Sequence, residues 1–452
     1  MEIGHKGALL VLTVVFAAML AAFNGATARM IASGKAGRII HRDTIVHGDG
    51  ARLYAHLRSI WFDGDFNTAN ELEHYFNYHG SREPVEIITT STGYAWNHTP
   101  VGCALLWSPF FFLGHATAVR MSGSGTGIAV DGYSPPYTLA IAIGTHVYCF
   151  LGIILLFLVC SRYFSTFASL LAVLTTWLAS FLPAYLFLYP SMSHAQSFFS
   201  VSFFIWLWLK ARERGRVLHW CLLGAAAGLM ALVRAQNIIF LCVPILGALG
   251  GARQILPVRR LSGVLLMGAC ALIVFSPQMY VWKLTYGSCL TIPQGAGFLH
   301  WARPAAREVL FSSRHGLLSW TPALILGFAG LPGFLKRERL LGLSLLMVLI
   351  LQLYLNSIVD DWWAGTGFGA RRFDNCLPIL ALGMAASYEW MRAKGTGWLA
   401  VILTAGFIAW NGLFICQYAL NWVSHSDPID MAKMAGNQAR MLFYIISRIR
   451  SI

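Results

Sequence analysis

The chain has 452 residues, of which 57% are hydrophobic and only 12% are charged. Soluble domains carry about 25% charged residues, so this composition argues against an ordinary soluble domain and favours a membrane protein. The net charge of +14 would suit a nucleic-acid binder, but the basic residues are spread over loops that flank apolar runs. Anionic lipid headgroups are therefore better partners than nucleic acid.

Apolar stretches long enough to cross a membrane recur along the chain. A spanning helix needs roughly 20 mostly apolar residues. Eleven stretches approach this requirement and predict an all-α polytopic membrane protein, organised as a single domain over residues 1–452. The predicted spans are 8–26, 136–159, 167–189, 196–210, 218–234, 237–252, 261–276, 320–335, 339–358, 376–390 and 398–419.

The distribution of charge predicts the orientation. If the first span runs outward, short cytoplasmic loops hold 14 of the 33 Lys and Arg residues, as the positive-inside rule requires. Fifteen of the 19 acidic residues then fall outside. Arg29, Lys35 and Arg38 conflict locally with this orientation, but the consistent inner loops outweigh them. We therefore expect a bacterial-type inner (plasma) membrane protein whose loop 29–133 and short tail 421–452 are extracytoplasmic.

The first loop, residues 29–133, is too polar to cross the membrane. Its apolar stretch 101–119 contains Pro109, and we expect it to form an interfacial or re-entrant helix beside the membrane. Immediately before this loop, at the end of the first predicted span, Ala26-Thr27-Ala28 resembles a signal-peptidase site. A polytopic protein more often keeps such a segment as an anchor.

Two residues of this loop are candidates for chemistry. Asp49 lies in His47-Gly48-Asp49-Gly50, and its carboxylate could act as a general base beside an acceptor hydroxyl or could simply cap a helix that begins near Ala51. His98 stands before Thr99-Pro100, where it could contact a lipid phosphate or a backbone carbonyl. Asp63 and Asp65 have the spacing of a turn or a helix cap.

Ionisable residues at the ends of later spans are further candidates, because such residues often face functional cavities. His194 follows Tyr189-Pro190-Ser191-Met192-Ser193. Arg234 lies between two apolar spans without a nearby acid in the sequence, so a phosphate is its natural partner, and snorkelling to the surface is the alternative. We include Gln236, two residues later, in the same binding site.

A glycine-rich segment, Trp362-Trp363-Ala364-Gly365-Thr366-Gly367-Phe368-Gly369-Ala370-Arg371-Arg372, precedes a late span. Arginine forks bind phosphate through two hydrogen bonds, and glycines allow close approach of the backbone. Trp363, Arg371 and Arg372 therefore predict a phosphate or substrate site. Arg314 and His315 form a similar but weaker pattern before Gly316.

These motifs together resemble the GT-C superfamily of polyprenyl-phosphate-sugar-dependent glycosyltransferases, of the family 39 type. The likeness is greatest to the branch with bacterial lipid A aminoarabinose transferases and protein O-mannosyltransferases. The Asp, Tyr and Arg of the family's first outer loop match Asp49, Tyr54 and Arg58. The family's Lys-Pro-Pro or His-Pro-Pro matches His98-Thr99-Pro100, with Thr in place of the first Pro.

The resemblance implies a GT-C-like bundle of about 11 transmembrane helices, with juxtamembrane helices in the long first extracytoplasmic loop. It implies an inverting, mannosyltransferase-like enzyme of the cell envelope that transfers a hexose or pentose from a polyprenyl-phosphate donor to a lipid, glycan or protein hydroxyl. Asp49 would be the catalytic base, and Arg234, Arg371, Arg372 and His98 would stabilise the departing phosphate. The alternatives are a transporter or flippase, or a non-catalytic binder, of lipid-linked sugars.

The resemblance does not carry a metal site over to this chain. His194 stands where the family has a second carboxylate, so a divalent metal shared with Asp49 is not supported, and no cofactor is assigned. The nine cysteines lie mostly within predicted spans and show no paired motif, which argues against a disulfide framework or a zinc site.

Overall fold

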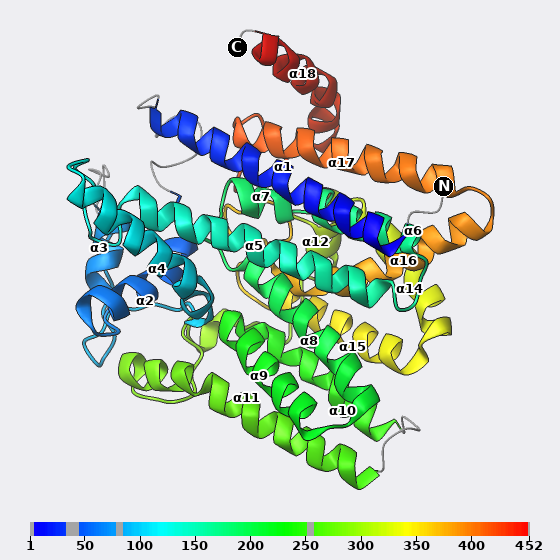
Figure 1. Ribbon diagram of the computed structural model, residues 1–452, viewed down its shortest axis with the longest axis horizontal. Helices are drawn as coiled ribbons and strands as arrows, with labels where there is room; N and C mark the ends of the chain where they lie inside the picture. Colours follow the sequence, from blue (N-terminus) through cyan, green and yellow to red (C-terminus); the bar gives the residue numbers. More distant parts are fainter. Residues whose placement is uncertain (1–3, 33–44, 78–84, 251–256, 451–452) are drawn as a thin grey trace. The chain divides into compact units, whose positions relative to one another are not determined.

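The computed structural model describes residues 4–32, 45–77, 85–250 and 257–450. Apart from two isolated bridges, the regular elements in these ranges are all helices (Figure 1). They divide into two compact units. Unit 1 comprises residues 1–35, 153–184 and 299–452, and unit 2 comprises residues 36–152 and 185–298. The expectation of one domain over 1–452 stays a prediction.

The helices have the following bounds. Unit 2 contains α2 (Asp49–Arg58), η1 (Ser59–Asp63), α3 (Ala69–Asn77), α4 (Gly102–Gly123), α8 (His194–Arg214), α9 (Val217–Val233), η2 (Ala235–Leu241), α10 (Cys242–Leu249), α11 (Pro257–Tyr286) and η3 (Ala296–Phe298). Unit 1 contains α1 (His5–Ala32), α6 (Thr166–Leu178), α12 (Ala306–Phe311), α13 (Leu317–Trp320), α14 (Leu324–Arg337), α15 (Arg339–Ser357), η4 (Arg371–Cys376), α16 (Leu377–Ala393), α17 (Gly397–Ala419) and α18 (Met431–Arg450). Helices α5 (Pro135–Cys160) and α7 (Leu182–Phe187) run through unit boundaries.

Glycines bring the main helices of unit 2 together. Helices α9 and α11 run side by side (Figure 1), and a Cβ on Gly224 would lie 2.4 Å from the carbonyl oxygen of Met267. Gly114 places α4 equally close to the start of α5, where a Cβ would lie 2.7 Å from the carbonyl oxygen of Pro136. Small residues at helix contacts are typical of membrane bundles, because van der Waals packing rather than water drives association there.

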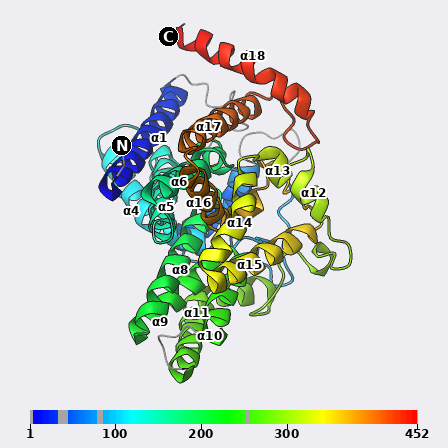
Figure 2. The same ribbon diagram turned by 90° about the vertical axis from the view of Figure 1, so that its right-hand side faces the viewer.

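In unit 1, glycines likewise allow close packing between α14 and α16. A Cβ on Gly383 would lie 2.0 Å from the carbonyl oxygen of Gly327, so the two backbones nearly touch. Helix α17 packs against α16 and α6, and α18 extends beyond the end of α17 (Figure 2).

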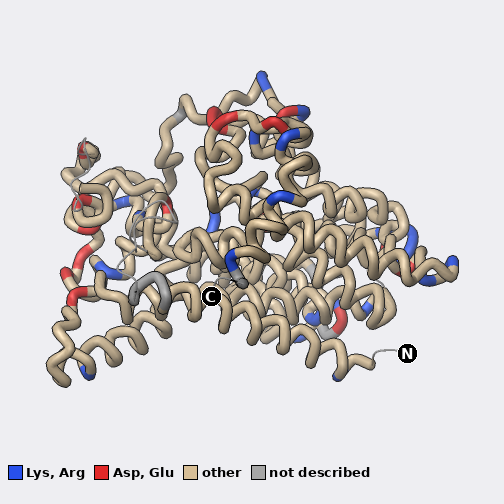
Figure 3. The backbone as a smooth tube through the Cα atoms, turned by 90° about the horizontal axis from the view of Figure 1, so that it is seen from above, with Lys and Arg blue, Asp and Glu red and all other residues tan. Residues whose placement is uncertain are grey.

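The predicted spans are confirmed as helices, but two of them are interrupted and 237–252 begins as the 3-10 helix η2. Residues 321–323 separate α13 from α14 within the stretch 320–335. The stretch 167–189 contains two helices, α6 and α7, separated by a bend at residues 179–181. Residues 251–252 of the predicted span 237–252 lie outside the described residues. Figure 3 shows charged residues near helix ends and in loops, with long helical stretches that carry none. The chain is therefore an all-α, multi-pass membrane protein.

Length and apolar composition identify fewer spans than the eleven predicted. Six helices of the described residues are long and apolar enough to cross a membrane, and five of them are among the eleven predicted spans. The sixth is α4, which we expected to be interfacial and which forms one continuous helix of 22 residues through Pro109. The count of eleven and the interfacial position of α4 stay predictions.

Candidate functional site

Asp49 is the first residue of α2, and a close contact fixes its position in unit 2. Gly48 before it has a φ of 57°, a conformation that favours glycine. Gly50 after it lies against Ser191, because a Cβ there would be only 2.0 Å from the Ser191 Oγ. The Asp49 side chain is 43% exposed. The carboxylate therefore stands at a packed helix terminus but remains accessible to a substrate.

His98 lies beside this carboxylate. Its Nε2 is 4.0 Å from Asp49 Oδ1, and its ring packs on Trp96 with centroids 4.9 Å apart. Helix α2 holds the neighbouring backbone, because Arg52 donates to the Trp96 carbonyl and His56 Nε2 lies 3.0 Å from the Thr99 carbonyl. Burial lowers the pKa of His56 to about 4, against the opposing effect of that carbonyl contact.

The other side of the segment is held by the end of α11 and the loop that follows it. The Tyr286 hydroxyl donates to the Asn97 carbonyl at 2.8 Å, and the Trp96 indole donates to the Pro293 carbonyl at 2.8 Å. His98 therefore sits on a segment that is bound on both sides, and its position beside Asp49 is built into unit 2.

His194 and Arg234 contact each other. Arg234 Nη1 lies 3.0 Å from His194 Nδ1 and 3.3 Å from Ser193 Oγ. A guanidinium can only donate, so Nδ1 accepts and the ring proton of His194 resides on Nε2. Gly102 brings the start of α4 to the end of α9 just before Arg234, since a Cβ there would lie 2.3 Å from the Leu232 carbonyl carbon.

Segment 191–194 joins these residues into one region of unit 2. Gly50 meets this segment at Ser191, and Arg234 meets it at Ser193 and His194. Four residues singled out by the sequence, Asp49, His98, His194 and Arg234, thus belong to one connected set. Gln236 is half-buried in η2, close to Arg234 in the chain.

An apolar groove of about 580 Å³ opens next to this region. Its lining includes Ala231 and Ala235, which flank Arg234 in the chain, together with Phe275 and Trp282 of α11. Such a groove suits a hydrocarbon chain rather than a polar molecule.

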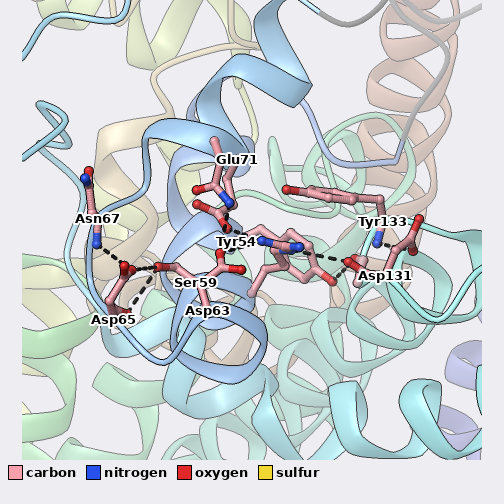
Figure 4. Close-up of polar contacts among 11 residues, drawn as sticks. Tyr54, Ser59, Asp63, Asp65, Asn67, Glu71, Asp131 and Tyr133 are labelled. Carbon is pink, nitrogen blue, oxygen red and sulfur yellow. Dashed lines mark hydrogen bonds and ion pairs between the residues drawn. The ribbon is translucent and has the colours of Figure 1, made fainter.

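The far end of α2 is fastened by Arg58, whose contact residues Asp63, Glu71 and Tyr133 are labelled in Figure 4. Arg58 Nη1 lies 2.5 Å from Asp63 Oδ2 and 2.8 Å from the buried Glu71 Oε1, and the guanidinium stacks over Tyr133. Burial raises the pKa of Glu71 to about 7, although Arg58 opposes this effect. We call Arg58, Asp63, Glu71 and Tyr133 the Arg58 cluster. Arg58 is therefore committed to a structural contact.

In unit 1, Arg314, His315 and Trp363 also form a built cluster. The Arg314 guanidinium lies 3.8 Å from the Trp363 ring centre, and its Nε donates to the Ser426 carbonyl at 2.6 Å. His315 Nδ1 lies 2.7 Å from the Trp363 carbonyl. His315 and Ala364 both have positive φ, 60° and 61°, a strained conformation that is often found at functional sites.

Arg371 also acts on this cluster. Burial lowers the pKa of His315 to about 4, and the charges of Arg371, Arg314 and His425 act in the same direction, against the hydrogen bond to the Trp363 carbonyl. Arg372 instead pairs with Asp361, at 2.6 Å from Nη2 to Oδ1. The positive charges of Arg314 and Arg371 therefore both act on His315, and Arg314 also stacks on the Trp363 ring.

Sequence reasoning missed three participants. Ser191 and Ser193 belong to no recognisable motif. Glu71 lies in a polar segment whose sequence predicts a solvent-exposed helix. Among the described residues, no three His, Cys, Asp or Glu side chains are grouped closely enough to hold a metal ion.

Comparisons with known proteins identify the fold. The structure of ArnT from Cupriavidus metallidurans, bound to undecaprenyl phosphate, is similar with a TM-score of 0.53 and 13% sequence identity, over 97% of this chain and 76% of ArnT. Archaeal oligosaccharyltransferase AglB from Archaeoglobus fulgidus, in complex with an inhibitory peptide and a dolichol-phosphate, is similar with a TM-score of 0.51 and 12% identity, over 93% of this chain. This chain spans only 61% of AglB.

No model of a protein family matches the chain, and no curated protein matches its sequence. The GT-C resemblance that the motifs indicate is nevertheless confirmed as a shared fold.

Proposed function

We propose that this chain, which has the GT-C fold, is an inverting glycosyltransferase that uses a sugar on a polyprenyl phosphate. The observation that carries this proposal is the connected set in unit 2, where an accessible carboxylate, Asp49, and a guanidinium, Arg234, meet the same segment beside an apolar groove. These are the three parts that such a donor requires: a base, an anion partner and a site for hydrocarbon.

The proposed reaction breaks one bond and forms another. Asp49 takes the proton of an acceptor hydroxyl, whose oxygen attacks the anomeric carbon from the face opposite the phosphate. The bond between the anomeric carbon and the phosphate oxygen breaks, and the polyprenyl phosphate leaves with the electron pair. Configuration at the anomeric carbon therefore inverts.

Arg234 stabilises the negative charge that develops on the leaving phosphate, and stabilisation of this kind is usually the largest catalytic contribution. His194, whose Nε2 carries the ring proton, is a second donor for the phosphate. His98, beside Asp49, orients the acceptor or contacts the phosphate. The first isoprene units of the donor occupy the groove that starts at Ala231 and Ala235.

The cluster of unit 1 is a second candidate for binding an anionic group of a substrate. Arg371 and Arg314 are its donors, and Trp363 provides an aromatic face for the sugar or the prenyl chain. Arg372, through its pair with Asp361, orders the loop that precedes η4. The acceptor is a lipid, glycan or protein hydroxyl, and the reaction takes place on the extracytoplasmic face of the inner membrane.

The test is turnover of labelled polyprenyl-phosphate sugars by the purified chain in liposomes. Asp49→Asn should abolish transfer and hydrolysis while donor binding is retained. Glu86→Gln, which changes an exposed carboxylate of the same loop, is the matched control and should leave turnover unchanged. Full activity of Asp49→Asn would refute Asp49 as the base.

The same liposomes test the two alternatives. Movement of the donor across the bilayer without its consumption would establish a flippase. Binding without either consumption or movement would establish a non-catalytic binder.

A further inference from the structure

Helix α18, at the end of unit 1, has an unusual distribution of charge. Its residues, Met431 to Arg450, include Lys433, Arg440, Arg448 and Arg450 but no acidic residue. In Figures 1 and 2 it extends beyond α17 rather than among the other helices of unit 1. A basic helix without compensating acids is a candidate for binding an anionic surface.

The start of α18 is fixed to unit 1. Asp430 Oδ1 accepts from the Lys433 backbone N–H at 3.0 Å, and Gln417 of α17 donates to the Met434 carbonyl at 3.1 Å. The Met434 and Met441 side chains are buried. One face of the helix is therefore packed, and this packing defines the direction in which its other faces point.

A second apolar face of α18 is exposed. Leu442, Phe443 and Ile446 are 46%, 72% and 38% exposed, and they lie on neighbouring positions of the helix surface because residues three and four apart share a face. Lys433, Arg440 and Ser447 recur every seven residues, about two helical turns, so they form an exposed polar strip next to this apolar face.

This arrangement matches a helix that lies in the plane of a membrane surface. Such helices bury one apolar face at the boundary between acyl chains and headgroups, and their basic residues contact anionic lipids. The chain is itself a membrane protein, so a bilayer is always adjacent to it. A packed face, an exposed apolar face and a basic strip are all explained by this one position.

We propose that α18 is a membrane-surface helix, with Leu442, Phe443 and Ile446 against the acyl chains and Lys433 and Arg440 against anionic phospholipid headgroups. The proposal is independent of the glycosyltransferase reaction. It assigns a lipid-binding role to the C-terminal segment, where the sequence alone predicted only a short external tail.

The test is photo-crosslinking of the full chain in vesicles. Benzoylphenylalanine replaces Phe443 in one variant and the exposed Arg448 in the other. The vesicles contain phosphatidylcholine with or without phosphatidylglycerol, each tagged on an acyl chain. The residue 443 probe should form lipid adducts, with an increased yield when phosphatidylglycerol is present. The residue 448 probe, about 140° around the helix from Phe443, should form far fewer.

The basic residues are tested in the residue 443 probe variant. Lys433→Gln with Arg440→Gln should remove the increase caused by phosphatidylglycerol. Arg303→Gln with Arg307→Gln, an equally exposed pair in the same unit, should preserve it. Thermal unfolding of each variant checks that the chain is folded.

Three outcomes would overturn the proposal. Equal lipid adducts from both probe positions would show that the apolar face does not point into the bilayer. A crosslinked dimer in place of lipid adducts would show that a second copy of the chain covers this face. A yield of lipid adducts that did not increase with phosphatidylglycerol would refute the role of Lys433 and Arg440 in the polar strip.

Discussion

Gly50 and Ser191 lie so close together that no larger residue fits at position 50, because an added Cβ would be 2.0 Å from the Ser191 Oγ. This contact joins the start of α2, with its carboxylate Asp49, to the segment that carries His194. Two parts of the chain far apart in sequence are thereby held at contact distance.

We predict that Gly50→Ala displaces the start of α2. Overpacking of this kind costs about 1–3 kcal/mol of stability, and donor turnover should fall further than the loss of folded protein explains, since Asp49 moves. Gly268→Ala in α11 is the control, because its Cβ would meet no atom within 4 Å. Thermal unfolding and turnover measure both effects. Normal turnover by folded Gly50→Ala would show that the contact does not position Asp49.

Arg234→Gln should weaken donor binding. Hydrogen bonds to charged groups contribute about 1.5–3 kcal/mol, so we expect KM for the donor to rise about 10- to 100-fold. Arg234→Lys keeps the charge without the planar fork and should have an intermediate effect. Arg120→Gln, at the exposed end of α4, should leave KM unchanged. An unchanged KM for Arg234→Gln would remove this residue from the donor site.

Glu71 should make stability depend on pH. Its pKa is about 7 in the folded chain, compared with 4.5 for the free carboxyl. Between these values the folded state binds more protons, so this residue's contribution to stability is present at low pH and is lost as pH rises through about 7. Glu71→Gln should lack this contribution.

The measurement is the difference in Tm between wild type and Glu71→Gln as a function of pH. His56 and His315, whose pKa values are lowered to about 4, act in the opposite direction, and the difference cancels their contributions. Relative to Glu71→Gln, wild type should lose stability as pH rises from about 4.5 to about 7. Parallel curves would refute a protonated Glu71.

Arg314 and Trp363 should be coupled energetically. A cation–π contact contributes about 0.5–2 kcal/mol, so Arg314→Lys and Trp363→Leu should each lower stability. The double variant should be destabilised by less than the sum of the two, since both single changes remove the same contact. Arg303→Lys, at an exposed position, is the control. If the two single losses of stability added exactly in the double variant, the contact between Arg314 and Trp363 would contribute no stability.

The helices could be predicted because a long run of apolar residues is by itself enough to indicate a membrane helix. The stretches around α5, α11, α15 and α17 are long, apolar and uncharged, and each is helical. The bend between α6 and α7 was not predicted, because the stretch 167–189 is apolar throughout. Its Pro183 lies in the first turn of α7, where proline is compatible with a helix.

The site was predictable residue by residue but not as an arrangement. His194 and Arg234 could be singled out because ionisable groups at the ends of apolar spans often face functional cavities. Asp49 could be singled out because a carboxylate in the external loop can act as a general base. Their connection depends on Gly50 and Gly102, whose close contacts involve residues distant in the chain. Glu71 was missed because burial of one face of α3 is decided by tertiary packing.

Helix α2 is ten residues or about 15 Å long, with Asp49 as its first residue and Arg58 as its last. Because the helix is rigid, a small tilt of α2 caused by a change in the Arg58 cluster also moves the Asp49 carboxylate. Substitutions around Glu71 would mimic active-site lesions in a rate assay even though they touch no substrate. A mutational scan that measured only the rate would therefore assign too many residues to the active site. A separate measurement of donor binding would distinguish residues that contact the substrate from residues that only position α2.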